Sequence, residues 1–127
     1  MKAIQDDCVL SRSVRNGRYY LHHAGGEQLF CENETNNQKI YNYANEVEYV
    51  KDGINDHVIH GEPTVNPKKT GSKFAVWYKL NLKAGEEKSI RIRLKKRKIA
   101  DPWADFDSIF DDRIRECEEF YNNIIDK

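Results

Sequence analysis

The sequence lacks a net charge and any long apolar run, and each absence excludes a class of protein. Its 127 residues include 21 Lys and Arg and 21 Asp and Glu, so the formal net charge is zero. A chain without excess charge has no overall field that draws it to nucleic acid or to an anionic membrane. No stretch approaches the roughly 18 apolar residues of a membrane span, and the segment Met1–Asp7 lacks the apolar core of a signal peptide. We therefore expect a soluble, cytoplasmic protein with no membrane or nucleic-acid partner.

Cysteine is also scarce, which excludes two kinds of stabilising site. Cys8, Cys31 and Cys117 are odd in number and widely spaced, with no Cys-x-x-Cys pattern, so they predict neither a disulfide framework nor a zinc site. His57 and His60 lie within one turn if their segment is helical, but no third or fourth ligand accompanies them. We expect no metal, no cofactor and no catalytic thiol. Cys31 and Cys117 are interpreted as small buried hydrophobic side chains.

What the sequence does contain is a set of strand patterns, in a length that suits one domain. Residues 8–10 suggest a short strand that ends before a turn at 15–17. Residues 18–32 alternate around Ala24-Gly25-Gly26 and predict a β-hairpin. A second hairpin is predicted from 74–82 and 90–94, where apolar and polar residues alternate on both sides of a turn.

The carboxyl end changes from a strand period to a helical one. Apolar residues recur every three or four positions and form a broad stripe, with Asp101-Pro102 as the expected start of the helix. The stripe contains Phe106, Phe110, Ile114, Cys117, Tyr121 and Ile124. The predicted fold is mainly β: a partial, antiparallel β-sandwich-like module over residues 1–100, and a C-terminal amphipathic helix over 101–127 that packs on it or leads out of it. Four or five strands do not close a sandwich or barrel of ordinary size, so these elements suggest part of a larger body.

The zero net charge hides two opposite blocks. Residues 83–98 contain eight basic and two acidic residues, and residues 101–119 contain eight acidic and two basic ones. The simplest interpretation is that two neighbouring elements neutralise each other or lie in solvent.

A long polar loop is expected over residues 32–72, between the two predicted hairpins. Loops of that length in small domains usually carry a site or a partner contact. Its Asn, Asp and His residues, with an aromatic nearby, are types that hold sugars. Trp77 faces away from the apolar side of its strand and is expected either to pack under a neighbouring element or to serve as a sugar platform or docking face. The candidate carbohydrate or domain-interface residues are Glu32, Glu34, Asn36, Asn37, Tyr49, Lys51, Asp52, Asn55, Asp56, His57 and Trp77.

Four segments together resemble the amino-terminal β-sandwich region of glycoside hydrolase family 63-like proteins, the relatives of mannosyl-oligosaccharide glucosidase. They are LFCENETNNQKIY (29–41), YVKDGINDHVIHG (49–61), VNPKKTGSKFAVWYKLNLKAGEEKSIRIRL (65–94) and DFDSIFDDRIRECEEFY (105–121). The resemblance implies an inverting glycosidase in which the sandwich accompanies an (α/α)6 toroid that carries the catalytic Asp and Glu. No toroid is present here, so no catalytic residue is carried over. Nor does the spacing of Glu32, Glu34, Asp52 and Asp56 fix a pair of carboxyls about 6.5–9.5 Å apart.

We therefore predict a non-catalytic β-sandwich module of a family 63-like glycosidase. It would support a catalytic (α/α)6 domain and line that domain's sugar pocket with its 32–61 loop. The predicted partners are that toroid or a neighbouring chain, an oligosaccharide, or a second copy through self-association. Two alternatives stay open. One is a stand-alone carbohydrate-binding module, and the other is a protein- or nucleic-acid-interaction domain that uses the basic strand 91–98.

Overall fold

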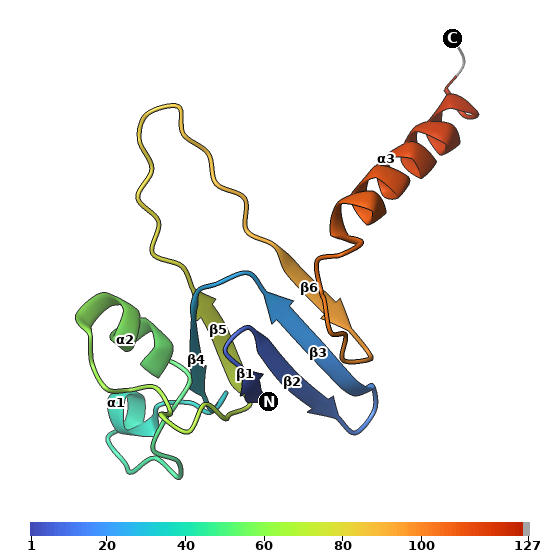
Figure 1. Cartoon of the computed structure of the whole chain (residues 1–127). Helices are drawn as coiled ribbons and strands as arrows, with labels where there is room; N and C mark the ends of the chain where they lie inside the picture. Colours follow the sequence, from blue (N-terminus) through green and yellow to red (C-terminus); the bar gives the residue numbers. More distant parts are fainter. Residues whose placement is uncertain (126–127) are drawn as a thin grey trace.

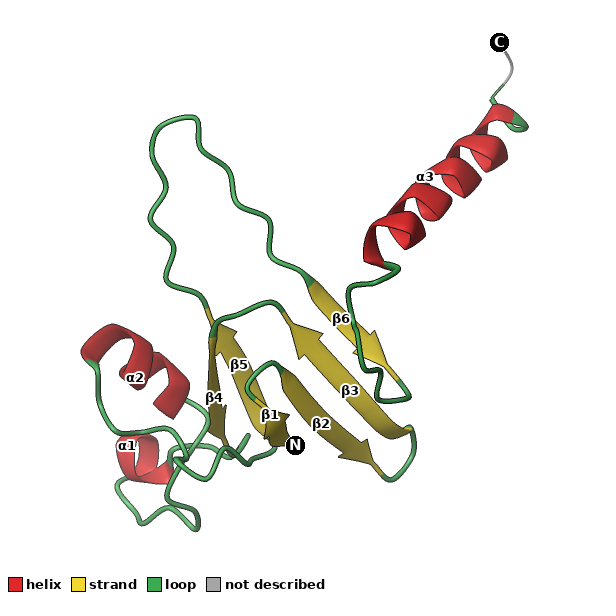
Figure 2. Cartoon of the chain, viewed as in Figure 1, coloured by secondary structure: helices red, strands yellow, loops and turns green. Residues whose placement is uncertain are grey.

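The computed structural model describes residues 1–125 and divides them into two antiparallel sheets and three helices (Figures 1 and 2). The mainly β fold with one C-terminal helix is thereby confirmed. The predicted helix range extends to residue 127, and residues 126 and 127 lie outside the described part. The elements are β1 (Lys2–Gln5), β2 (Cys8–Ser13), β3 (Gly17–His23), β4 (Glu27–Cys31), α1 (Asn37–Tyr41), α2 (Gly53–His60), β5 (Lys73–Trp77), β6 (Ile92–Lys95) and α3 (Phe106–Asn122).

The first predicted hairpin, over residues 18–32, is wrong in its pairing. The larger sheet has the order β1-β2-β3-β6 and the smaller one pairs β4 with β5, so β3 and β4 belong to different sheets. Gly25 and Gly26 have φ of 73° and 84° and carry the chain from one sheet to the other. A Cβ at Gly26 would lie 2.6 Å from Val76 Cγ1, which explains why this crossing requires glycine.

The second predicted hairpin is wrong as well. β5 ends at Trp77 and pairs with β4, so that Phe74 lies opposite Phe30. β6 begins at Ile92 and pairs with β3, so that Leu94 lies opposite Leu21. Residues 78–91, here named the arm, form an extended loop that projects from the ends of both sheets (Figure 1). The alternation identified residues 74–77 and 92–94 correctly as strand, but residues 78–82 and 90–91 lie in the arm. It also did not identify the strand partners, because each apolar row fits any sheet face that buries it.

The core is centred on β4, whose consecutive residues Leu29, Phe30 and Cys31 alternate between its two faces and are all buried, and it includes Val9 of β2. The Phe30 ring stacks on Phe74 with the centroids 5.7 Å apart. The sheets are also joined through the backbone, because Gly71 N–H donates to Met1 O over 3.1 Å. A Cβ at Gly71 would lie 2.2 Å from Cys31 O, so the absence of a side chain allows this junction.

Residues 32–72 are less irregular than expected, since α1 and α2 lie within them. α1 is capped by Asn36, whose side chain accepts a hydrogen bond from Lys39 N–H. α2 ends at Gly61, whose φ of 71° gives the left-handed conformation typical of a helix end.

The C-terminal helix begins four residues later than the expected Asp101-Pro102 start. Asp101 Oδ1 instead accepts a hydrogen bond from Trp103 N–H over 2.9 Å, and Asp105 occupies the position before α3. No residue of α3 is buried, and the helix leads away from both sheets (Figure 1). Cys117 is therefore exposed, and its predicted burial is wrong, whereas Cys31 is buried as predicted. Within the described residues, no helix has the length and apolar character needed to cross a membrane.

Candidate functional site

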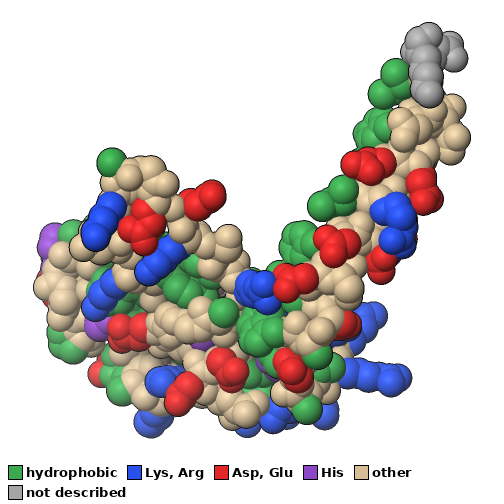
Figure 3. Space-filling model, turned by 45° about the horizontal axis from the view of Figure 1, so that its top comes forward, with side chains coloured by type: hydrophobic (Ala, Val, Ile, Leu, Met, Phe, Trp, Pro, Cys, Tyr) green, Lys and Arg blue, Asp and Glu red, His purple; other side chains and the backbone are tan. Residues whose placement is uncertain are grey.

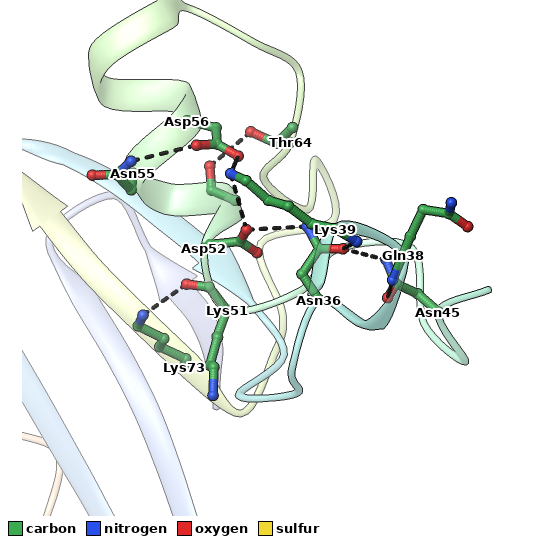
Figure 4. A network of polar contacts seen from close by, with 11 residues as sticks. Asn36, Gln38, Lys39, Asn45, Lys51, Asp52, Asn55, Asp56, Thr64 and Lys73 are labelled. Atoms are coloured by element: carbon green, nitrogen blue, oxygen red, sulfur yellow. Dashed lines mark hydrogen bonds and ion pairs between the residues drawn. The ribbon is translucent and has the colours of Figure 1, made fainter. Parts of the chain in front are cut away.

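The polar loop is organised around one asparagine, Asn36 (Figure 4). Asn36 Oδ1 accepts hydrogen bonds from Lys39 N–H and from Asn45 Nδ2, each over 3.1 Å. Its Nδ2 donates to Asp52 Oδ2 over 3.0 Å. One amide thereby ties α1 both to the loop that follows it and to the start of α2.

Lys39 lies between the two carboxylates at the start of α2. Its Nζ is 3.5 Å from Oδ2 of both Asp52 and Asp56. Burial acts to raise the pKa of Asp52, but the hydrogen bonds from Asn36 and Lys39 outweigh it, and the pKa is lowered. A carboxyl with a lowered pKa stays ionised at neutral pH and is a poor general acid. This arrangement suits a network that fixes the loop better than one that transfers protons.

The remaining loop candidates connect neighbouring segments. Glu32 Oε2 accepts hydrogen bonds from Ser72 N–H and Oγ, which attaches the end of β4 to the start of β5. Lys51 Nζ donates to Thr35 Oγ1 over 3.3 Å, and Tyr49 O accepts from Glu32 N–H over 2.8 Å.

Three candidates lie at the edge of this network. Glu34 accepts a hydrogen bond from Lys51 N–H through its backbone carbonyl, while its side chain is exposed. Asn37 is the first residue of α1. Asn55 is exposed and reaches Asp56 Oδ1 over 3.4 Å.

Trp77 and His57 form a second cluster, separate from Asn36. The two rings meet edge to face with centroids 5.9 Å apart, so Trp77 contacts α2. Lys79 Nζ lies 3.7 Å from the centroid of the Trp77 ring. His57 Nδ1 donates to Glu62 O over 2.8 Å, which fixes the imidazole. Because Trp77 is already contacted by His57 and Lys79, a sugar could stack on the ring only after Lys79 moves away.

Cys8 and His22 form a buried pair away from the polar loop. No group of three or more His, Cys, Asp and Glu is placed to hold a metal within residues 1–125. Cys8 Sγ is 3.8 Å from His22 Nε2, and both residues are buried. Burial raises the pKa of Cys8 and lowers that of His22, so the pair favours its uncharged form over the thiolate and imidazolium that a nucleophile needs.

The most unusual surface belongs to α3. Phe110 and Ile114 each have an exposed fraction of 57%, and Phe120 has 58%. Figure 3 shows green apolar side chains along the left edge of the projecting helix. We call this row the α3 stripe; it comprises Phe106, Ile109, Phe110, Ile114, Cys117, Phe120 and Tyr121. A soluble domain rarely exposes so continuous an apolar surface unless it binds something there.

Two arginines of the basic strand hold the start of α3 against β6. Arg93, only 8% exposed, donates to Pro102 O over 2.8 Å and pairs with Asp105. Arg91 Nη2 lies 2.7 and 3.0 Å from the two oxygens of Asp107. The hydrogen bonds from Arg93 lower the pKa of Asp105. We call this set the clasp; its four charges set the direction in which α3 leaves the sheet.

A cavity of about 330 Å³ lies where the arm meets α3. Ser89, Ile90 and Arg91 line it on one side and Phe106, Asp107 and Phe110 on the other. The α3 stripe therefore begins at a cavity that has a mixed apolar and polar lining and includes Arg91 and Asp107 of the clasp.

Sequence reasoning missed several of the residues that organise these sites. Lys39 and Asn45 were overlooked, although an asparagine is a common helix cap that accepts a hydrogen bond from the backbone N–H three residues later, which could have indicated the contact between Asn36 and Lys39. The clasp was foreshadowed by the opposite charge blocks. The sequence did not show which arginine meets which aspartate.

Comparison with known proteins gives one informative relative. The chain is 34% identical over 106 residues to the uncharacterized protein YMR196W of Saccharomyces cerevisiae, a match that covers 73% of this chain and 10% of the relative. The chain thus spans about a tenth of the length of that protein. No protein-family model and no solved structure matches the chain.

Proposed function

We propose that this chain is a non-catalytic β module that packs against a larger helical catalytic domain, in the manner that its resemblance to family 63-like glycosidases implies. The observation that carries the proposal is the α3 stripe, a long apolar surface that no other described element covers. The yeast relative supports it, because a similar segment there makes up only about a tenth of the protein.

The 32–61 loop would form one side of the sugar pocket of that larger domain. Its amides and carboxylates are held by the Asn36 network, which gives a preorganised polar surface. We assign the module a supporting role in carbohydrate metabolism, with the cytoplasm as the expected compartment.

Docking is tested with the yeast relative from which the matching segment has been deleted. We expect the purified chain to bind this truncated protein and to co-elute with it in size-exclusion chromatography. A Phe110→Ser/Ile114→Ser variant should elute separately. Co-elution of that variant, or independent migration of the unmodified chain, would contradict the docking role.

Glycosidase chemistry is tested separately. Full-length yeast relative should hydrolyse α-linked glucosides, and this chain alone should not. Hydrolysis by the isolated chain would overturn the non-catalytic assignment, and an inactive full-length relative would argue against the glycosidase family while leaving docking intact.

The two alternative functions have less support. A nucleic-acid-binding strand is disfavoured because Arg91 and Arg93 are already paired with Asp107 and Asp105. A stand-alone carbohydrate-binding module predicts chemical-shift changes in residues 32–61 on titration with gluco-oligosaccharides, and a weaker response in Trp77→Ala. An identical titration of Trp77→Ala would eliminate Trp77 as the platform.

A further inference from the structure

We infer that the α3 stripe, together with the cavity at its base, is a docking site for a helix whose apolar face is bordered by Lys or Arg. This inference rests on the proposed docking role and specifies the chemistry of the partner. The stripe is long and narrow, about 25 Å for 17 residues at 1.5 Å per residue. A rod-shaped element running along α3 matches this shape, and its side chains would interdigitate with the rows of the stripe.

The charge beside the stripe is negative. By the helical repeat, Asp107, Asp111 and Glu118 lie on the same flank of α3, next to the apolar residues. Asp107 pairs with Arg91, but no cation within the described residues pairs with Asp111 or Glu118. The last turn of α3 also has no basic side chain, so the negative end of the helix dipole is left uncompensated. A basic edge on the partner would pair with Asp111 and Glu118 and would also compensate the negative end of the α3 dipole.

The opposite flank is already neutralised within the helix. Arg115 lies 2.6 Å from Asp112 and 3.9 Å from Glu119, and Arg113 lies 2.6 Å from Glu116. The two flanks therefore differ in available charge, which gives the docking site an orientation.

A second copy of this chain fits the surface poorly. α3 contains six acidic and two basic residues, so two such helices side by side would repel each other.

The preorganisation of the site comes from the clasp. Arg91 and Arg93 hold the start of α3 at a fixed angle to β6, and the Arg91 guanidinium lies 5.1 Å from the centroid of Phe106. The cavity between Ile90 and Phe110 is therefore formed before any partner arrives.

The test uses two designed helical peptides of about 21 residues with the same leucine face. One has lysine and the other has glutamate along the edge of that face. The chain should bind the lysine-edged peptide and not the glutamate-edged one, with an affinity that falls as salt rises. In Asp111→Asn/Glu118→Gln the affinity should fall by about three- to tenfold, the range for two partly exposed ion pairs.

The matched control is Asp112→Asn/Glu119→Gln, which makes the same chemical changes one residue further along. Because Asp112 and Glu119 are already paired with Arg115, the affinity of this variant for the peptide should change by less than about twofold. Circular dichroism confirms that both variants keep α3. Equal losses in the two variants, or tight binding of the glutamate-edged peptide, would overturn the inference.

Sedimentation of the free chain tests whether a second copy, and not a basic-edged partner, covers the α3 stripe. A dimer that disappears in Phe110→Ser/Ile114→Ser would show that a second copy covers the stripe, which also overturns the inference. Failure of the peptides alongside co-elution with the truncated yeast relative would reject the basic-edged partner but keep the docking role. Peptide binding without co-elution would keep the basic-edged partner but reject docking to the larger domain.

Discussion

Phe30 and Phe110 provide a matched test, because the same substitution is made in opposite environments. Phe30 is fully buried in the core and stacks on Phe74, so Phe30→Ala should lower the free energy of unfolding by about 3–5 kcal/mol. Phe110 is 57% exposed and touches Phe106 with the ring centroids 5.0 Å apart. The loss of that exposed contact is offset by the better helix propensity of alanine, about 0.5 kcal/mol, so Phe110→Ala should change stability by less than about 0.5 kcal/mol.

Phe110→Ala should have a larger effect on docking than on the stability of the free chain. Complete burial of a phenylalanine side chain is worth about 1.5–3 kcal/mol, and about half of that gain is still available to Phe110 because 57% of the residue is exposed. Phe110→Ala should therefore weaken docking by about 1–1.5 kcal/mol, or about five- to twelvefold in Kd.

Urea denaturation followed by far-ultraviolet circular dichroism measures the stability of both variants, and co-elution with the truncated yeast relative measures docking. A loss of stability in Phe110→Ala as large as that in Phe30→Ala would refute the reasoning. It would show that α3 packs against its own sheets in solution and that the stripe is not free to bind. A near-neutral Phe30→Ala would instead show that the core is misplaced.

Three further predictions concern the loop and the clasp. Gly53→Ala should lower the free energy of unfolding by about 1–3 kcal/mol in urea denaturation, because the new Cβ would lie 2.2 Å from Thr64 O; unchanged stability would disprove that close approach. Asn36→Ala should cost about 1–2 kcal/mol in the same assay because it removes a helix cap. Asn36→Asp keeps the cap but should also lower the stability, because a carboxylate oxygen replaces the amide that donates to Asp52 Oδ2 over 3.0 Å; unchanged stability in Asn36→Asp would disprove that contact. The folded pKa of Asp105 is lowered, so the stability that it gains from Arg93 is fully present above about pH 4 and is lost as the pH falls through the folded pKa. The protection factors of the amides at the start of α3, which correct for slower intrinsic exchange in acid, should therefore fall as the pH is lowered, and an equally large fall in Arg93→Gln would contradict this cause.

Part of the strand content could be predicted from the sequence, but the pairing could not. Residues 74–77 and 92–94 are strands as predicted, whereas residues 78–82 and 90–91 of the predicted strands lie in the arm, and β1 was not predicted. The partners of β5 and β6 were missed because a tight turn at 83–87 is the simplest local explanation for two neighbouring strands. β6 instead pairs with β3, a contact that depends on how the two sheets bury their faces.

The polar loop shows a different limit. Its candidate residues were chosen for the chemistry of their side chains, and the structure uses most of that chemistry internally. Asn36 and Asp52 bond to each other, and Trp77 contacts His57. The sequence identifies polar groups, but whether they face a ligand or one another depends on contacts between residues up to 40 positions apart, as in Glu32 and Ser72.

The opposite charge blocks link the fold to the proposed function. Their local cancellation was expected, and the structure assigns it to two pairs, Arg91 with Asp107 and Arg93 with Asp105. Because these pairs use carboxylates at the start of α3, they anchor that end of the helix and leave Asp111 and Glu118 further along without a cation in the described chain. The same charges that appear balanced in the composition are therefore divided in space. The basic block orients the helix, and the unpaired part of the acidic block is what an approaching partner would meet.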